Sequence, residues 1–195
     1  ICVAAALGYT HERTAWNMTV DLAAPHATGL LDTTAAEAAL AARGVEVRRA
    51  TPADVPTLVE FATSAFGPGW GAEVADSVGR PGTGCHLAVR PGGPAARAGD
   101  EPAAGAGEVL GFATYGSSRP SWFGPMGTAA SARGLGVGGV LLRRCLRDQF
   151  AAGLRRVQIG WVGPVPFYSK TVGARIERVF LLYRKPAPQG AASAA

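Results

Sequence analysis

The feature that most constrains this chain is a glycine-rich turn between a predicted strand and the strongest predicted helix. The turn reads Arg133-Gly134-Leu135-Gly136-Val137-Gly138. Glycine lets the backbone bend sharply, and the start of a helix offers free N–H groups together with the positive end of the helix dipole. The segment therefore predicts an anion site, and a pyrophosphate is the ligand that suits it best.

Two common glycine motifs explain this turn poorly. A Walker A loop requires a Lys directly after the last glycine, and none follows here. The dinucleotide fingerprint G-x-G-x-x-G is present at Gly134, Gly136 and Gly139, but the next predicted strand, residues 156–162, ends without an acidic residue for a ribose. A turn with a purely structural role is the remaining alternative to the interpretation that follows.

The turn and its flanks resemble the GNAT superfamily of acyl-CoA-dependent N-acetyltransferases. Residues 133–138 match the R-G-x-G-[IV]-G form of that family's [RQ]-x-x-G-x-[GA] motif. The resemblance continues with Leu141-Leu142 and with Phe167-Tyr168-x-Lys170-x-x-Gly173, and it covers residues 45–185. It implies an α/β (α+β) fold in which helices lie on both faces of a mixed, mostly antiparallel central sheet.

Hydrophobic periodicity and turn residues predict the elements of such a fold. Strands are expected at residues 45–50, 85–90, 109–116, 123–128, 156–162 and 176–184. Helices are expected at residues 52–66, 70–80, 138–152 and 166–172, the first with a capping box between Thr51 and Asp54. Residues 91–107 predict a hairpin loop without regular structure. The arginines at positions 143, 144 and 147 are expected on a solvated helix face.

The resemblance also implies roles for individual residues. The N–H groups of residues 133–138 would hold the pyrophosphate of acetyl-CoA, the co-substrate, and the strand before the turn would pair with its pantetheine arm. The cofactor-binding residues expected in this way are Met126, Gly127, Thr128, Arg133, Gly134, Leu135, Gly136, Val137 and Gly138. Tyr168 matches the family's general acid, and a phenol keeps its proton at neutral pH. No metal is implied.

The general base is left open, because the strand that precedes the turn carries no acidic residue where the family often has a Glu. The candidates elsewhere are Asp54, Glu60, Glu73, Asp76 and His86, each of which is more readily a surface group. Aromatic residues with equal claims on the acceptor cleft and the core are Trp70, Trp122, Phe123, Trp161 and Tyr115.

Two functions follow from these observations. The first is direct transfer of an acetyl or short acyl group from CoA to an amine of a small molecule or peptide. The alternative is a non-catalytic acyl-CoA-binding or regulatory module, which the absent strand acid suggests. Nucleic-acid binding is disfavoured, because the net charge of +5 comes from scattered arginines without a basic stripe.

The cysteines and the hydropathy pattern suggest a cytoplasmic protein. Cys2, Cys85 and Cys145 lie far apart and form no C-x-x-C, which is typical of incidental thiols in a reducing compartment. No apolar run reaches 18 residues, so no membrane partner is expected.

The first 22 residues echo the end of the chain. Leu7-Gly8-Tyr9-Thr10-His11-Glu12-Arg13 aligns with Val172-Gly173-Ala174-Arg175-Ile176-Glu177-Arg178, and an apolar strand follows each. We therefore expect residues 45–186 to form the acyltransferase domain and residues 187–195 a disordered tail. Residues 1–44 would be an extension: the end of a preceding GNAT repeat and a linker helix at 33–43. A homodimer or pairing with a second GNAT domain is the expected assembly.

Overall fold

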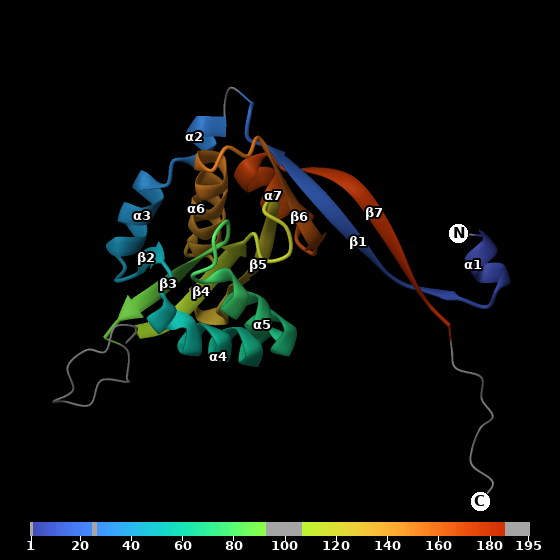
Figure 1. Ribbon diagram of the computed structural model, residues 1–195, viewed down its shortest axis with the longest axis horizontal. Helices are drawn as coiled ribbons and strands as arrows, with labels where there is room; N and C mark the ends of the chain where they lie inside the picture. The colour runs from blue at the N-terminus through green and yellow to red at the C-terminus, as the bar shows by residue number, and fades with distance from the viewer. Residues whose placement is uncertain (1, 25–26, 93–106, 186–195) are drawn as a thin grey trace, which may run out of the picture.

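The computed structural model describes residues 2–24, 27–92 and 107–185 (Figure 1). Its strands form one sheet in the order β2-β3-β4-β5-β6-β1-β7. The strands are β1 Thr10–Asp21, β2 Glu46–Arg49, β3 Gly84–Pro91, β4 Gly107–Tyr115, β5 Trp122–Thr128, β6 Arg156–Val162 and β7 Arg175–Arg184. Neighbours are antiparallel except β5 and β6, which run parallel. The predicted mixed, mostly antiparallel sheet is confirmed.

Helices cover both faces of this sheet. They are α1 Cys2–Ala6, α2 Ala27–Leu31, α3 Thr34–Ala41, α4 Val55–Phe66, α5 Pro68–Ser77, α6 Val137–Ala151 and α7 Val165–Val172, with short 3-10 helices at Pro52–Asp54 and Ala130–Ala132. One core lies between α4, α5 and strands β3 and β4, and a second core joins α6 and α7 to the other face. On β3, Leu87 belongs to the first core and Ala88 to the second, as the two-residue period of a strand requires.

The start of α4 follows the predicted capping signal. The Asp54 carboxylate accepts hydrogen bonds from the Thr51 N–H and hydroxyl, both at 2.8 Å, and from the Arg48 guanidinium at 2.7 Å. The guanidinium holds the pKa of Asp54 down at about 2. Because Asp54 is buried, this pairing ties β2 to the first turn of the helix pair.

The predicted boundary after residue 44 does not separate two structural units. β1 lies inside the sheet, between β6 and β7. The predicted linker helix is α3, and it packs on α6, where Arg144 Nε donates to the Glu37 carboxylate at 2.8 Å. The expectation that Arg144 belongs to a solvated face is therefore wrong, because its partner comes from a helix more than a hundred residues earlier.

β1 and β7 extend beyond the body of the molecule as a two-stranded ribbon that leads to α1 (Figure 1). Their ladder runs from Thr10 opposite Arg184 to Thr19 opposite Arg175. The predicted hairpin loop joins β3 to β4, and its residues 93–106 lie outside the described residues, as does the predicted tail at 187–195.

Candidate active site

The parallel strands β5 and β6 separate after two pairs of residues. Trp122 is opposite Gln158 and Phe123 opposite Ile159, and beyond them the strands diverge. On its other side β5 carries a bulge, since the register against β4 jumps from Phe123 to Met126. The bulge is held by the buried Thr114 hydroxyl, which donates to the carbonyl of Pro125 at 3.2 Å.

A cavity of about 620 Å³ fills this opening in the sheet. It is lined by Trp70 and Glu73 of α5, residues 117–118, residues 122–126 of β5, residues 159–164 of β6 and its following turn, and Tyr168 of α7. Since α5 and α7 lie on opposite faces of the sheet, side chains from both faces line the cavity. A long, narrow co-substrate and a second reactant can therefore meet within it.

The glycine turn leads into α6 at one end of this opening. Gly134 (φ +80°) and Gly136 (φ +92°) have left-handed backbone conformations that glycine adopts without strain. The amides of Arg133 and Leu135 donate within the turn. The amides of Gly134 and Gly136 have no backbone acceptor among the described residues, and first-turn amides such as that of Gly138 have none within a helix.

Gly138, in the first turn of α6, lies close to β5 and α7. A Cβ atom at this position would lie 3.4 Å from Met126 Cε and 3.5 Å from both Thr128 Oγ1 and Phe167 Cζ. The turn thus packs against the end of β5 and the residue that precedes Tyr168. The fold brings together the three segments to which the sequence assigned the co-substrate and the general acid.

Tyr168 is buried in the wall of the cavity. Its ring packs edge-on against Phe123 at 6.3 Å and against Phe167 at 5.0 Å. Its hydroxyl makes no hydrogen bond with a residue that the structure describes. Burial raises the pKa of Tyr168 to about 12. The phenol is therefore protonated at neutral pH and its proton is available to a group inside the cavity.

Four of the five aromatic candidates line the cavity, namely Trp70, Trp122, Phe123 and Trp161. Tyr115 does not, and lies with Arg49 and His86 in a polar cluster around Asp148, a residue that the sequence did not single out. The Asp148 carboxylate bonds His86 Nε2 at 2.8 Å and Arg49 at 2.5 Å. A separate hollow of about 370 Å³ borders Arg49 and Tyr115.

Among the five candidate bases, Glu73 is the one that lines the cavity. Asp54 is bound to Arg48, Asp76 pairs with Arg80 at 2.6 Å, and His86 is bound to Asp148. Glu60 on α4 and Glu73 on α5 are both exposed, and Glu60 is not in the cavity lining. Sequence reasoning had no means of choosing among them, because the choice depends on how α5 is placed against the opening between β5 and β6.

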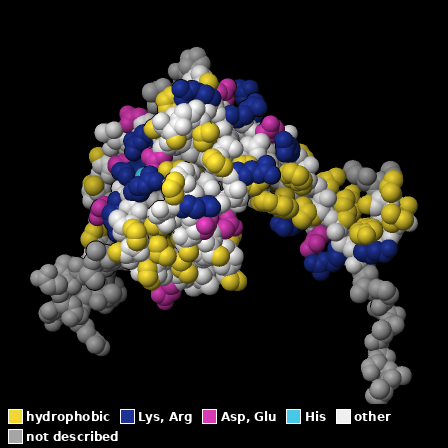
Figure 2. All heavy atoms as spheres, in the orientation of Figure 1, with side chains coloured by type: hydrophobic (Ala, Val, Ile, Leu, Met, Phe, Trp, Pro, Cys, Tyr) yellow, Lys and Arg dark blue, Asp and Glu magenta, His cyan; other side chains and the backbone are white. Residues whose placement is uncertain are grey.

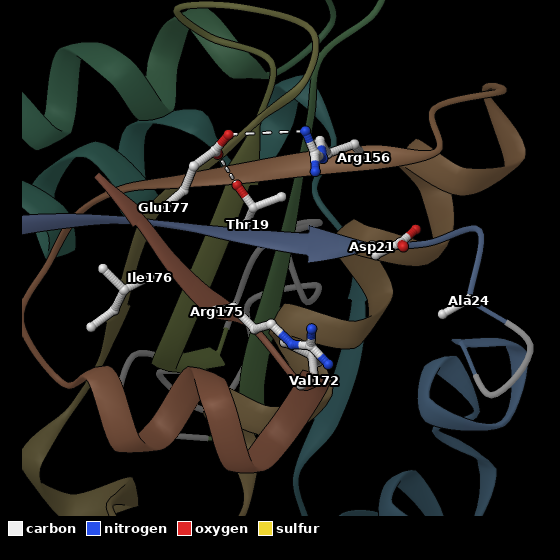
Figure 3. Close-up of a pocket in the computed structure, with 9 residues that line it drawn as sticks. Thr19, Asp21, Ala24, Arg156, Val172, Arg175, Ile176 and Glu177 are labelled. Carbon is white, nitrogen blue, oxygen red and sulfur yellow. Dashed lines mark hydrogen bonds and ion pairs between the residues drawn. The ribbon is translucent and has the colours of Figure 1, made fainter. Parts of the chain in front are cut away.

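A further hollow of about 290 Å³ lies between β1, β6 and β7, beside the end of α7 (Figure 3). Charged residues of both signs surround it, and Glu177 accepts a hydrogen bond from the Thr19 hydroxyl beside Arg156.

The described residues contain no cluster of three or more His, Cys, Asp or Glu that could hold a metal ion. Burial raises the pKa of the Cys85 thiol to about 12.

A glycine turn lies beside the point where two parallel strands diverge, and a buried tyrosine lies across that opening. The chain has the fold of the GCN5-related N-acetyltransferases, the GNAT superfamily. The resemblance inferred from the turn is confirmed at the level of the fold. No family model and no curated protein matches the sequence.

Solved structures supply the comparison. The chain superposes on the GCN5-related glucosamine N-acetyltransferase region of a fungal multi-domain GH3 β-N-acetylglucosaminidase with a TM-score of 0.64 and 16% identity, over 93% of this chain and 22% of that one. A GCN5-related N-acetyltransferase from Sphaerobacter thermophilus gives 0.63 and 17%, over 94% and 55%. A tandem GNAT protein from the clavulanic acid biosynthesis pathway gives 0.53 and 16%, over 93% and 56%. The chain thus spans less than two thirds of each of these proteins.

Within the described part of the chain, no helix has the length and apolar character that crossing a bilayer requires.

Proposed function

We propose that this chain transfers an acetyl group, or another short acyl group, from CoA to the amine of an acceptor. The observation that carries the proposal is the cavity between the diverging ends of β5 and β6, which has Tyr168 in its wall and the glycine turn at its end. Both features are needed together, since the turn would bind an anion and the cavity would hold the reacting thioester beside a proton donor.

The residues present fit acetyl-CoA. Free amides at Gly134, Gly136 and the first turn of α6 would bind the pyrophosphate, with the dipole of a 15-residue helix behind them. The exposed guanidinium of Arg133 adds a positive charge at the same place. The edge of β5 from Met126 to Thr128 would pair with the pantetheine arm, because β6 has moved away from that edge.

The chemistry would be a direct acyl transfer. The amine nitrogen forms a bond to the thioester carbon, and the carbon–sulfur bond breaks. Tyr168 donates its proton to the departing thiolate and is reprotonated from solvent. Glu73 accepts the proton that the amine loses, directly or through a water. Tyr168 and Glu73 come from opposite faces of the sheet, so each would meet its own reactant.

The acceptor side of the cavity favours an amine with an apolar body. Trp70, Trp122 and Trp161 line the cavity, and aromatic side chains can attract ammonium groups. Glu73 is the one carboxylate in the lining. A single acidic group suits a monoamine better than a polycationic aminoglycoside, which would require several carboxylates.

The first test is the melting temperature with saturating acetyl-CoA, with NADH as the control dinucleotide. A ligand at a hundredfold excess over its dissociation constant stabilises the folded state by about 2.7 kcal/mol. Stabilisation by acetyl-CoA alone, followed by thiol release with a panel of hydrophobic primary amines, supports the proposal. Stabilisation without turnover on any amine indicates the non-catalytic acyl-CoA-binding module instead. The proposal would be overturned if acetyl-CoA and NADH raised the melting temperature equally, or if neither raised it.

A further inference from the structure

The two strands of the projecting ribbon begin in the same way. Gly8 (φ +78°) lies two residues after the end of α1 and Gly173 (φ +66°) directly follows α7. Each glycine is separated from the next strand by one residue. Glu12 and Glu177 follow the two glycines at the same distance. When the chain is aligned on itself by placing Gly8 on Gly173, α1 therefore coincides with α7 and β1 with β7.

The ladder between β1 and β7 obeys this internal alignment. Any antiparallel pair has a local two-fold axis, so the informative property is where the axis falls. When each residue of a pair is replaced by its equivalent in the alignment, the result is again a pair of the ladder. Thr10–Arg184 becomes Arg175–Thr19, Arg13–Leu182 becomes Arg178–Asn17, and Thr14–Leu181 becomes Val179–Trp16. Ala15 and Phe180 face each other and exchange, so the axis passes through that pair. The symmetry of the sequence and that of the structure coincide.

The irregularities of the ribbon repeat as well. The ladder skips Glu12 on β1 and Glu177 on β7, which are equivalent residues. The Glu12 carboxylate pairs with Arg184 at 2.8 Å, and the Glu177 carboxylate accepts from Thr19, the equivalent of Arg184 (Figure 3). Bulges are specific features of a strand. Two equivalent bulges with equivalent side-chain bonds indicate two halves built to the same plan.

The two halves differ sharply in what covers them. In the proximal half, residues 16–21 of β1 pair with β6 on their outer side, and Met18 and Val20 enter the core. In the distal half, residues 181–184 of β7 have no outer neighbour among the described strands. Leu7 is 59% exposed although its equivalent Val172 is 3% exposed, and Phe180 is 38% exposed. Hydrophobic side chains accordingly gather on the ribbon in Figure 2.

An exposed apolar ribbon of this kind is costly by itself. Two strands alone are marginally stable in water, and an open strand edge invites pairing with another strand. Two distal residues, Leu7 and Tyr183, are nevertheless apolar where their equivalents are core. Tyr183, which is half-buried, corresponds to Met18, which is 1% exposed. These side chains are therefore suited to packing against a hydrophobic core that the described residues do not supply.

We propose that the distal half of the ribbon closes the sheet of a second GNAT-fold unit, which precedes α1 in the same polypeptide. In the described unit β6 precedes α7 and pairs with residues 16–21 of β1. The equivalent strand of the second unit precedes α1 and pairs antiparallel with β7 from Leu181 onward. β1 and β7 are then each shared by two sheets, and the units hold each other through exchanged strands.

The alternative occupant, a second copy of this chain, fits less well. To continue the sheet, residues 181–184 need to pair with a strand that has a free edge. β6 would have such an edge if β1 did not occupy it. In each copy β6 is already paired with that copy's β1. The similar solved structures of which this chain spans about half, one of them described as a tandem GNAT protein, agree with a unit of the same fold in the same polypeptide.

Hydrogen exchange tests the proposal on two proteins, the 195-residue chain and the polypeptide that its gene encodes. Backbone amides of residues 181–184 are expected to exchange at least tenfold more slowly in the encoded polypeptide. Amides of residues 16–21 serve as the control and should exchange equally in both. Equal exchange at residues 181–184, or an encoded polypeptide without a GNAT-fold unit before α1, would overturn the proposal.

A matched pair of variants makes the same test through side chains. Met18→Asp should lower the melting temperature of both proteins, because Met18 is in the described core. Tyr183→Asp should lower it only in the encoded polypeptide, by at least 5 °C. Light scattering of the 195-residue chain adds one more outcome: a dimer that Tyr183→Asp dissociates would assign the ribbon to contact between copies and refute the second unit. None of these measurements depends on acyl transfer.

Discussion

The side-chain oxygen of Asn17 accepts a hydrogen bond from the backbone N–H of Trp161 at 3.1 Å. Trp161 is the one non-glycine residue with a positive φ, +52°, among the residues described. Its indole stacks on Phe180 at 5.9 Å and lies under the Arg13 guanidinium at 5.5 Å. The ribbon strands thereby hold the strained backbone of a residue that lines the proposed acceptor cavity.

We expect Asn17→Ala to impair acceptor binding more than acetyl-CoA binding. The loss of the bond leaves the Trp161 N–H without this partner. It also frees Trp161 to leave its left-handed conformation, which is strained for a non-glycine residue. Steady-state kinetics should show a raised KM for the amine and an unchanged KM for acetyl-CoA. Thr19→Ala removes another β1 side-chain bond away from the cavity and is the control. Equal KM effects in both variants would exclude a positioning role for Asn17.

Tyr168→Phe should lower kcat without weakening acetyl-CoA binding. General acid catalysis contributes about 10²- to 10⁴-fold, and the variant removes only the hydroxyl. Because burial raises the pKa of Tyr168 to about 12, the wild-type protein should retain the proposed proton donor up to at least pH 10. Thiol release measured from pH 6 to 10 checks both statements. A variant with wild-type kcat would remove Tyr168 from the mechanism.

Glu73→Gln tests the proposed base. We expect kcat/KM to fall about 10²-fold or more at neutral pH, since a carboxamide cannot accept a proton. Glu60→Gln is the matched control, because Glu60 lies exposed on α4 outside the cavity lining. The same loss in both variants would point to overall charge instead of catalysis.

Two glycines with the same φ allow effects on stability to be separated from effects on binding. Gly136 and Gly153 flank α6, both have φ +92°, and a Cβ at either would meet no atom within 4 Å. Alanine at each should cost about 1 to 2 kcal/mol of unfolding free energy, because an L-residue is strained there. Only Gly136→Ala should weaken acetyl-CoA binding as measured by calorimetry, by tenfold or more. Equal affinities in the two variants would count against the turn as the pyrophosphate site.

Acid titration should reveal the Arg48–Asp54 pair. The pKa of Asp54 is lowered to about 2 from 3.8, so its contribution is present above pH 4 and is lost as the pH falls through 2. The shift corresponds to about 2 kcal/mol of unfolding free energy. Urea unfolding of Asp54→Asn should therefore differ from wild type at pH 5 much more than at pH 2. Asp76→Asn, at the exposed pair with Arg80, should change stability by less than about 1 kcal/mol.

Local patterns predicted most elements because their signals act over a few residues. The run of apolar residues at 156–162 predicted β6, and the glycine-rich segment before residue 138 predicted the start of α6. The Thr51–Asp54 signal located the start of the α4 region, although a 3-10 turn precedes the α-helix proper. The echo between the two ends of the chain was also visible in the sequence, as a shared Gly and Glu at equal spacing.

The sequence by itself determined the fold class, the glycine turn and the identity of the proton donor to test, since each rests on neighbouring residues. The tertiary structure alone decided that β1 lies between β6 and β7, that Arg144 binds α3, and that Glu73 faces the cavity. Those facts depend on contacts between segments far apart in the chain. No periodicity within a single segment encodes which distant strand or helix will supply the partner.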